Sequence, residues 1–401
     1  MTKPPLWLLV FIVGLPQFAE TVYSPSLPEI SHALGTSHAM VEHTLSIYLF
    51  AFSLGTLMWG PMSDMLGRKL PLLCGFFIYV LGCIGCYLSS SIEVLLLSRF
   101  VQAFGGSAGS TLGQVILRDA FSGNKRSIAF STIGAALSIS PAIGPLVGGW
   151  LAEFFGFRGV FAFLVILGGL ILYQIKKFLY ETHPQHARSR YSLLKVMRIL
   201  IKDPKVLIYG ALIGGMNGIM FSYYGEGSFY LIEMLGLSPS AYGASFILLS
   251  IAAMIGAKLC TYFLKHGMAM ETIIWLGLSL CFLASFSFLG CSSFEIIHGE
   301  SPRASIHIIL LCMILMYCGI NLTRPSILSN ALEDYQPMLG TASALFVCYY
   351  YLITSLLTFI MATIRNGSLI IMPLYFLILS LSMLVLFEGL RWRGGIKKII
   401  E

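Results

Sequence analysis

Charged side chains are scarce in this sequence. Only 11% of its 401 residues are Asp, Glu, Lys or Arg, whereas 57% are hydrophobic and the mean hydropathy is +0.84. Because a soluble domain carries about 25% charged residues, this composition excludes a soluble globular protein and indicates an integral membrane protein. The net charge of +7 is then a signal of membrane orientation, and we expect no nucleic acid partner.

Catalytic and metal-binding signatures are also missing. The sequence has no glycine-rich nucleotide loop, and its eight histidines and nine cysteines show no metal-type spacing. Most of the cysteines fall within apolar runs, where we interpret them as small packing residues. We therefore predict that the chain is not an enzyme and that it needs no metal and no cofactor.

Long apolar runs follow one another along the whole chain. A helix needs about 20 residues to cross the hydrocarbon core, and barrel strands would instead alternate over about ten residues. Backbone groups in lipid must be satisfied within their own segment, so we predict an all-α membrane protein with twelve transmembrane helices. Their predicted bounds are 6–33, 41–62, 70–89, 93–118, 127–152, 157–177, 206–232, 240–264, 270–291, 305–330, 339–363 and 369–390.

One polar interval, "ETHPQHARSRYSLLKVMRILIKDPK" (181–205), is longer than the other breaks between spans. We interpret it as a cytoplasmic linker that is partly an amphipathic helix on the membrane surface. It separates an N-terminal half of six helices (1–180) from a C-terminal half of six helices (206–401). Two such halves are typical of secondary transporters, which bind a small-molecule substrate near the midplane of the bilayer.

Positive charges gather on one side of the predicted membrane. If the chain starts inside, nineteen of the 25 Lys and Arg residues face the cytoplasm, and only Arg158, Arg303 and Arg365 face the outside. The positive-inside rule then places both termini in the cytoplasm. We predict a multi-pass protein of a bacterial inner (cytoplasmic) membrane that acts as a monomer.

The stretch "GPMSDMLGRKL" (60–70) puts Asp64, Arg68 and Lys69 between two apolar runs. Its glycines permit a tight turn, and its cations can anchor at the lipid headgroups. The stretch resembles the G-x-x-x-D-x-x-G-R-[KR] signature between helices 2 and 3 of the major facilitator superfamily. That resemblance implies that Asp64 and Arg68 are gating residues, which hold the cytoplasmic ends of the two halves together in the outward-open state. A simple turn with orienting charges is the alternative.

Further segments resemble the same family. "SRFVQAFGGSAGS" (98–110) is similar to the helix 4 motif whose arginine, here Arg99, is tied to proton coupling. "SPAIGPLVGGWL" (140–151) resembles the helix 5 antiporter motif, which implies gating roles for Gly144, Pro145 and Gly148; close helix packing is the alternative. Three more segments resemble the bicyclomycin and chloramphenicol resistance group of drug:proton antiporters: "ILRDAFSGNKRSIAFS" (116–131), "GLSPSAYGASF" (236–246) and "LGTASALFV" (339–347).

Glu20 and Glu226 are acids that fall within predicted spans. Proton coupling needs a carboxylate that is buried enough to hold a proton, yet reachable from either side in turn. We predict Glu20 as the principal proton carrier, Arg99 as its electrostatic regulator and Glu226 as the second candidate. The helix 1 pattern of the family is D-x-Y-x-P-x-L-P, which aligns its acid with Thr21, so its role cannot be copied to Glu20 unchanged. A structural hydrogen bond or ion pair is the alternative for each acid.

Polar and aromatic residues within the spans are candidates for the substrate cavity. Arg324 and Asn321 stand in "GINLTRPSIL", where Pro325 frees backbone carbonyls. Arg324 could pair with Glu226 or bind an anionic substrate group. Aromatic side chains suit flat, partly apolar ligands but also pack helices. The remaining cavity candidates are Thr21, Tyr23, Tyr48, Tyr223, Tyr224 and Tyr349.

Together, these residues and the resemblance predict a proton-coupled secondary active transporter that exports small amphipathic compounds or drugs by alternating access. Two alternatives stay open. The chain could be a dedicated exporter or importer of a metabolite such as a siderophore or nutrient, or a transporter-like sensor that moves nothing. The embedded charges of Glu20, Arg99 and Arg324 weigh against a sensor, because charge at membrane depth is costly without a function. The expected partners are a small-molecule substrate, protons and the lipid bilayer.

Overall fold

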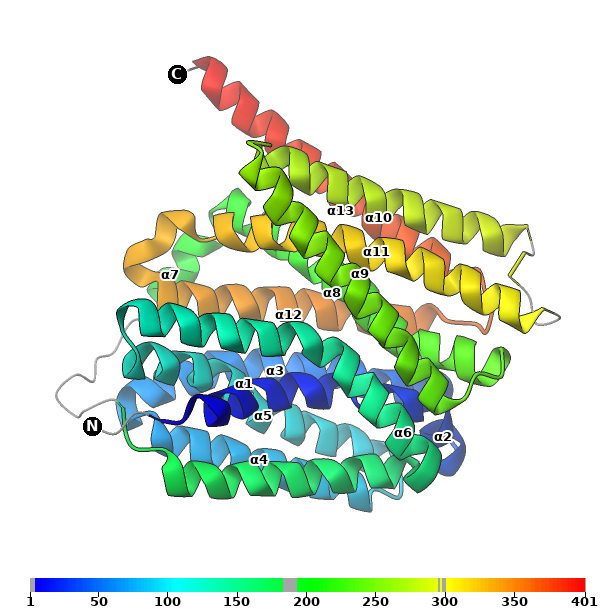
Figure 1. The fold of residues 1–401 in the computed structure, drawn as a ribbon, viewed down its shortest axis with the longest axis horizontal. Coiled ribbons are helices and arrows are strands. Elements are labelled where there is room, and N and C mark those ends of the chain that lie inside the picture. Colours follow the sequence, from blue (N-terminus) through cyan, green and yellow to red (C-terminus); the bar gives the residue numbers. More distant parts are fainter. Residues whose placement is uncertain (1–3, 183–192, 295, 298–300, 401) are drawn as a thin grey trace. The chain divides into compact units, whose positions relative to one another are not determined.

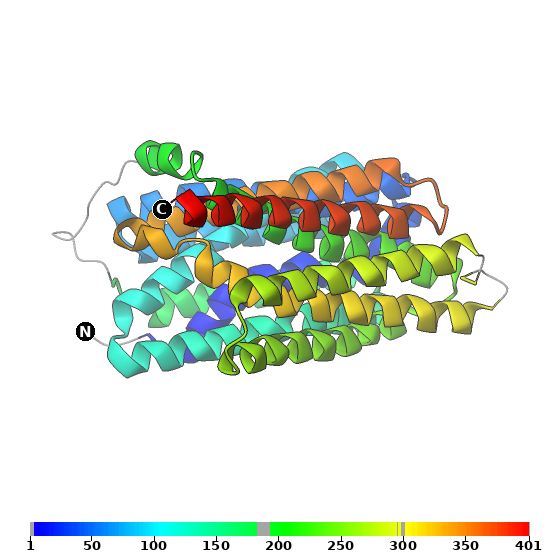
Figure 2. The same cartoon turned by 90° about the horizontal axis from the view of Figure 1, so that it is seen from above.

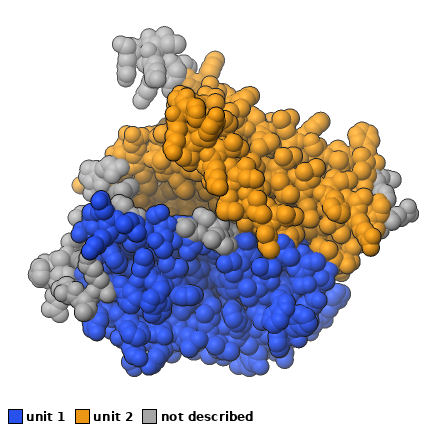
Figure 3. All heavy atoms as spheres, viewed as in Figure 1, with its two compact units in different colours: residues 1–193, 238–244 blue, residues 194–237, 245–401 orange. Residues whose placement is uncertain are grey.

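The computed structural model describes residues 4–182, 193–294, 296–297 and 301–400, and within these ranges all regular structure is helical (Figure 1). The chain divides into two compact units (Figure 3). Unit 1 comprises residues 1–193 and 238–244, and unit 2 comprises 194–237 and 245–401. Residues 183–192 of the predicted linker lie outside the described residues. The following part of the linker forms the short helix α7 (Leu193–Leu200).

The first span of unit 1 is not one continuous helix. Its first helix ends at Thr21, and the chain then passes through a turn and a short 3-10 helix before it becomes α-helical again. Pro25 and Pro28 stand in the first turns of the two following elements, where no backbone N–H is needed. The elements of unit 1 are α1 (Leu6–Thr21), η1 (Ser24–Ser26), α2 (Leu27–Ala33), α3 (His38–Leu66), α4 (Lys69–Leu88), α5 (Ile92–Ala120) and α6 (Gly123–Phe178).

Helix α6 contains two predicted spans that are joined at one residue. Gly156 has a φ of +67°, a conformation that favours glycine, and a Cβ there would crowd the carboxylate of Glu29. Oε2 of Glu29 accepts a hydrogen bond from the backbone N–H of Phe157 at 2.8 Å. The carboxylate thereby caps the start of the second segment, because the first N–H groups of a helix lack intrahelical acceptors.

Glycines bring α4 and α5 close together and so fix the position of α5. A Cβ at Gly82 would overlap the backbone of Gln102, and a Cβ at Gly105 would overlap the backbone of Tyr79. Small residues at such crossings let helices pack closely in a membrane, where lipid supplies no hydrophobic drive for association. This contact between the helices positions Arg99 and Gln102 of α5, which belong to the candidate site described below.

Unit 2 repeats the all-helical pattern, as the view in Figure 2 also shows. Helix α8 continues directly into a π-helical turn, η3. The first residues of α9 belong to unit 1, where a Cβ at Gly243 would overlap the carbonyl of Pro145. The elements are α8 (Pro204–Ser228), η3 (Phe229–Met234), α9 (Pro239–Lys265), α10 (Met270–Ser293), α11 (Pro302–Asn330), η4 (Glu333–Met338), α12 (Leu339–Ile364) and α13 (Ile371–Ile400).

Ten helices among the described residues are long and apolar enough to cross a membrane. The two further spans are α5, which is rich in glycine, serine and glutamine, and the part of α6 before Gly156. The chain is therefore an all-α membrane protein with twelve spans, as the sequence predicted.

Candidate functional site

Arg99, in α5, is completely buried within unit 1. Its guanidinium carbon lies 3.9 Å from the ring centre of Tyr23 and 4.2 Å from that of Tyr48. Nη1 donates hydrogen bonds to Oε1 of Gln102 (2.5 Å) and to the carbonyl of Ala19 (3.4 Å). A desolvated cation over an aromatic face gains about 2 kcal/mol or more, so two rings offset part of the cost of burying the charge.

Hydrogen bonds hold both tyrosine rings against the cation. The Tyr23 hydroxyl lies 2.9 Å from Oγ1 of Thr44, and the Tyr48 hydroxyl donates to the carbonyl of Pro16 at 2.9 Å. Tyr48 belongs to α3, and Tyr23 lies in the turn between α1 and η1. The structure thus gathers these two predicted cavity residues around Arg99, inside unit 1.

Glu20 lies in the last turn of α1 and is buried. The residue before it, Ala19, supplies the carbonyl that accepts from Arg99, and Glu20 is within electrostatic reach of Tyr48. The bond to Ala19 thus places the guanidinium of Arg99 at the end of α1 that carries Glu20.

The glycine motif of α6 packs against the end of α1. A Cβ at Gly144 would overlap Oγ1 of Thr21, and a Cβ at Gly148 would overlap the backbone carbonyl of Val22. Pro145, between them, is buried. The predicted gating residues of α6 therefore touch the turn that directly follows Glu20, and Thr21 contributes to this packing.

Arg68 is the centre of a second charged cluster in unit 1. Its guanidinium pairs with Asp64 and, at 3.0 Å between Nε and Oδ2, with Asp119. Nη1 also donates to Oγ of Ser63 at 2.9 Å, and the backbone N–H of Arg68 donates to Oε1 of Glu181 at 2.8 Å. The predicted pair of Asp64 and Arg68 is thus part of a larger set of contacts.

Sequence reasoning did not assign Asp119 and Glu181. Asp119 stands in the R-D-x-F stretch at the end of α5, and Glu181 is the first residue of the polar interval after α6. The sequence could have identified both as possible partners of Arg68, because each is an acid on the same predicted side of the membrane. The sequence could not say which cation either acid would meet.

In unit 2, Glu226 pairs with Arg365, with 2.7 Å between Oε2 and Nε. The guanidinium carbon of Arg365 lies 4.5 Å from the ring centre of Phe229. The sequence left open a pair between Arg324 and Glu226. Arg324 instead donates from Nη2 to Oδ1 of Asn217 at 2.6 Å. Arg365 was assigned only an orienting role, because it follows the last apolar residues of its span.

Arg324, in α11, is held by neutral groups. Besides the bond to Asn217, its Nη2 lies 3.3 Å from the sulfur of Met220. Asn321, one turn earlier, donates to the carbonyl of Tyr317 at 2.9 Å, which occupies its amide within the helix. A partly buried cation with neutral partners can still attract an anion. Tyrosines within electrostatic reach of Arg324 are Tyr224, Tyr317, Tyr350 and Tyr351.

The other tyrosines predicted for the cavity pack helices within unit 2. Tyr224 stacks on Phe246 with ring centres 4.8 Å apart, and Tyr223 contacts the same ring at 5.7 Å. Tyr349 donates from its hydroxyl to the carbonyl of Leu207 at 3.3 Å. These contacts tie α8 to α9 and to α12.

Comparisons with known proteins place this geometry in context. Residues 6–358 match the sequence profile of the Major Facilitator Superfamily. An "uncharacterized transporter" of Rickettsia bellii is 33% identical over 390 residues, which is 95% of each chain. A "bicyclomycin resistance protein homolog" of Haemophilus influenzae is 28% identical over 335 residues, or 82% of each chain. The solved structure of the POT family transporter PepTSo aligns with a TM-score of 0.77 at 11% identity, over 96% of this chain and 98% of that one.

Proposed function

The chain belongs to the Major Facilitator Superfamily, and from this premise we propose that it exports small amphipathic compounds in exchange for protons, by alternating access. It is a transporter and not an enzyme, because that family consists of transporters. The observation that carries the proposal is Arg99, a buried cation held between two tyrosine rings next to the turn of Glu20. Resistance proteins among its relatives support the substrate class.

Glu20 is the principal proton carrier in this proposal, and Arg99 is its regulator. A nearby cation favours the ionised carboxylate, whereas a buried carboxylate without that cation favours the protonated form. Movement of Arg99 between its tyrosine rings and Glu20 would therefore release and reload the proton. Glu226 is the second candidate, although its pairing with Arg365 also suits a structural role.

The gating roles follow from the two clusters of unit 1. We propose that Asp64 and Arg68 form the gate at the ends of α3 and α4, with Asp119 as a third member. Gly144, Pro145 and Gly148 form the second gating element of unit 1, because their packing fixes the turn after Glu20.

Substrate contacts are proposed for both units separately. In unit 2 they are Arg324 and Asn321 together with Tyr223, Tyr224 and Tyr349, and in unit 1 they are Thr21, Tyr23 and Tyr48. The distribution of Lys and Arg supports a bacterial inner membrane location with both termini in the cytoplasm. We propose a monomeric transporter with a cytoplasmic linker over residues 181–205.

Proton flux in liposomes tests the proposal. Purified protein is reconstituted with a pH-sensitive dye inside, and chloramphenicol or bicyclomycin is then added outside as the first probes. Exchange predicts a substrate-evoked pH change that a protonophore removes and that Arg99→Gln abolishes. Lys258→Gln, which removes an exposed cation of α9, is the matched control. Transport at a normal rate without proton movement would contradict the proposal.

Arg324 favours a second candidate function. Its bonds to the neutral groups of Asn217 and Met220 leave its charge available to an anion. A dedicated transporter of a carboxylate-bearing metabolite would use this charge, while an exporter of neutral drugs would not. Arg324→Gln separates the two, because it should abolish transport of an anionic metabolite and leave export of neutral compounds largely intact.

A further inference from the structure

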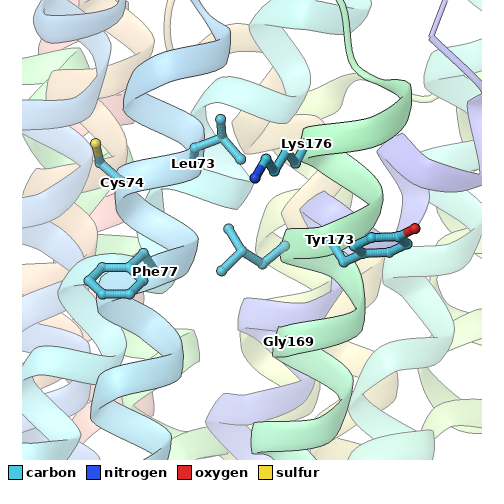
Figure 4. Close-up of a pocket in the computed structure, with 7 residues that line it drawn as sticks. Leu73, Cys74, Phe77, Gly169, Tyr173 and Lys176 are labelled. Atoms are coloured by element: carbon cyan, nitrogen blue, oxygen red, sulfur yellow. The ribbon is translucent and has the colours of Figure 1, made fainter.

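A groove lies between α4 and α6 in unit 1, and none of the residues that line it was assigned a role in transport. Its volume is about 480 Å³. Figure 4 shows Leu73 of α4 and Lys176 of α6 pointing into the space between the two helices, while the rings of Phe77 and Tyr173 lie at its outer flanks. Residues that line the groove include Leu73, Cys74, Phe77, Gly169, Tyr173 and Lys176.

The groove has an apolar wall that is open to its surroundings. Phe77 is 56% exposed and Tyr173 is 58% exposed, and the neighbouring Leu170 is 55% exposed. Exposed apolar surface of this kind on a membrane-spanning helix meets lipid acyl chains, because the hydrocarbon core contains no water.

Positive charge gathers at one end of the groove. Nζ of Lys69 donates to the carbonyl of Lys176 at 3.2 Å, so both ammonium groups lie at the same end of α4 and α6. Lys177 follows directly and is exposed. The acid at this end, Glu181, is engaged by the backbone N–H groups of Arg68 and Lys69. The three lysines outnumber this acid.

We propose that this groove binds an anionic phospholipid, with one acyl chain against the apolar wall and the phosphate at Lys176 and Lys69. A basic pocket between membrane helices is suited to an anionic headgroup, and the lysines disfavour a cationic amphiphile. From Gly169 to Lys176 the groove is about 10 Å long. That length fits part of an acyl chain and is too short for a second transmembrane helix. A bound lipid would bridge α4 and α6.

Native mass spectrometry of the full chain, titrated with phosphatidylglycerol or phosphatidylcholine, tests the proposal. Gly169→Leu fills the groove without strain, because no atom lies within 4 Å of a Cβ built there. Gly290→Leu, at an equally open helical glycine of α10, is the control. The affinity of the Gly169 variant for its most tightly bound phosphatidylglycerol should fall at least fivefold, whereas the affinity of the control should not change. Equal retention by both variants would overturn the proposal.

Headgroup selectivity gives the second measurement. Lys176→Gln keeps the apolar wall and should lower the preference for phosphatidylglycerol over phosphatidylcholine about fivefold, as expected for one lysine near an anionic lipid. Lys258→Gln should leave that preference unchanged. A phosphatidylglycerol with a photoreactive acyl chain should label peptides of α4 and α6. Labelling spread evenly over all helices would refute the lipid proposal. A dimer mass, which would show that a second copy of the chain occupies the groove, would also refute it.

Discussion

Nε of Arg365 lies 2.7 Å from Oε2 of Glu226, and both side chains are almost completely buried in unit 2. The ring of Phe229 covers the guanidinium. The pair joins the residue that caps α12 to the last turn of α8. Removing one partner of such a pair leaves the other charge desolvated and unpaired, which costs more than removing both.

Arg365→Met is therefore expected to destabilise unit 2 by about 3 to 5 kcal/mol. The double variant with Glu226→Gln should recover at least half of that loss, because no buried charge is then left alone. Chemical unfolding in mixed micelles measures the free energy of unfolding of the double variant and of each single variant. A double variant whose loss equals the sum of the single losses would show that the two residues do not stabilise each other.

Gly148→Leu is expected to damage transport more than Gly144→Ala. The first variant forces a side chain into the backbone carbonyl of Val22. The second overlaps chiefly the side-chain hydroxyl of Thr21, which can rotate. Transport by Gly148→Leu should fall at least tenfold, with membrane insertion kept. Gly290→Leu, which meets open space, is the control. Normal transport by Gly148→Leu would exclude a role for this contact.

Much of the fold could be predicted from the sequence, because apolar runs and their polar or proline boundaries are local signals. The expected spans 240–264 and 270–291 correspond to Pro239–Lys265 and Met270–Ser293. The interruption of the first span at Thr21 was not predicted, since hydropathy does not register a turn between apolar residues. The kink at Gly156, in contrast, falls at the predicted break between the spans 127–152 and 157–177.

The partners of the site residues could not be predicted, because they come from distant parts of the chain. The sequence indicated that Arg99 needs a partner, yet nothing in it pointed to the rings of Tyr23 and Tyr48 on both sides of the cation. The partner of Glu226 was Arg365, a cation that hydropathy assigns to a loop. Burial of a residue follows from local pattern, whereas its contacts follow from helix packing.

Asp64→Asn is expected to shift the equilibrium toward inward-open states. Asp64 is 40% exposed, so water screens its pair with Arg68, and the loss should be about 0.5 to 1 kcal/mol. Adding Asp119→Asn should enlarge the shift, because Arg68 then loses both carboxylates. Distances between spin labels on the two halves measure the populations. A sharp loss of substrate affinity in a conformationally locked Asp64→Asn variant would contradict the gate assignment.

Tyr48→Leu is expected to impair coupling, whereas Tyr48→Phe should nearly preserve it. The phenylalanine keeps the aromatic face over Arg99 and loses only the bond to Pro16, while leucine removes a contact worth about 2 kcal/mol. The measurement is the pH profile of transport, which should change for leucine and stay in place for phenylalanine. A purely structural role would lower the rate of both variants without moving either profile.

Glu20→Gln is expected to abolish proton-coupled transport in a protein that still folds and still binds substrate. Glutamine mimics the protonated acid and carries no negative charge to attract Arg99. The cycle of proton release and reloading therefore cannot run. Glu20→Asp keeps the charge and should retain a pH-dependent but slower exchange. The experiment compares substrate accumulation against its gradient at several values of pH. If Glu20→Gln still concentrates substrate in a pH-dependent way, another acid carries the proton, and Glu226 is the next to replace.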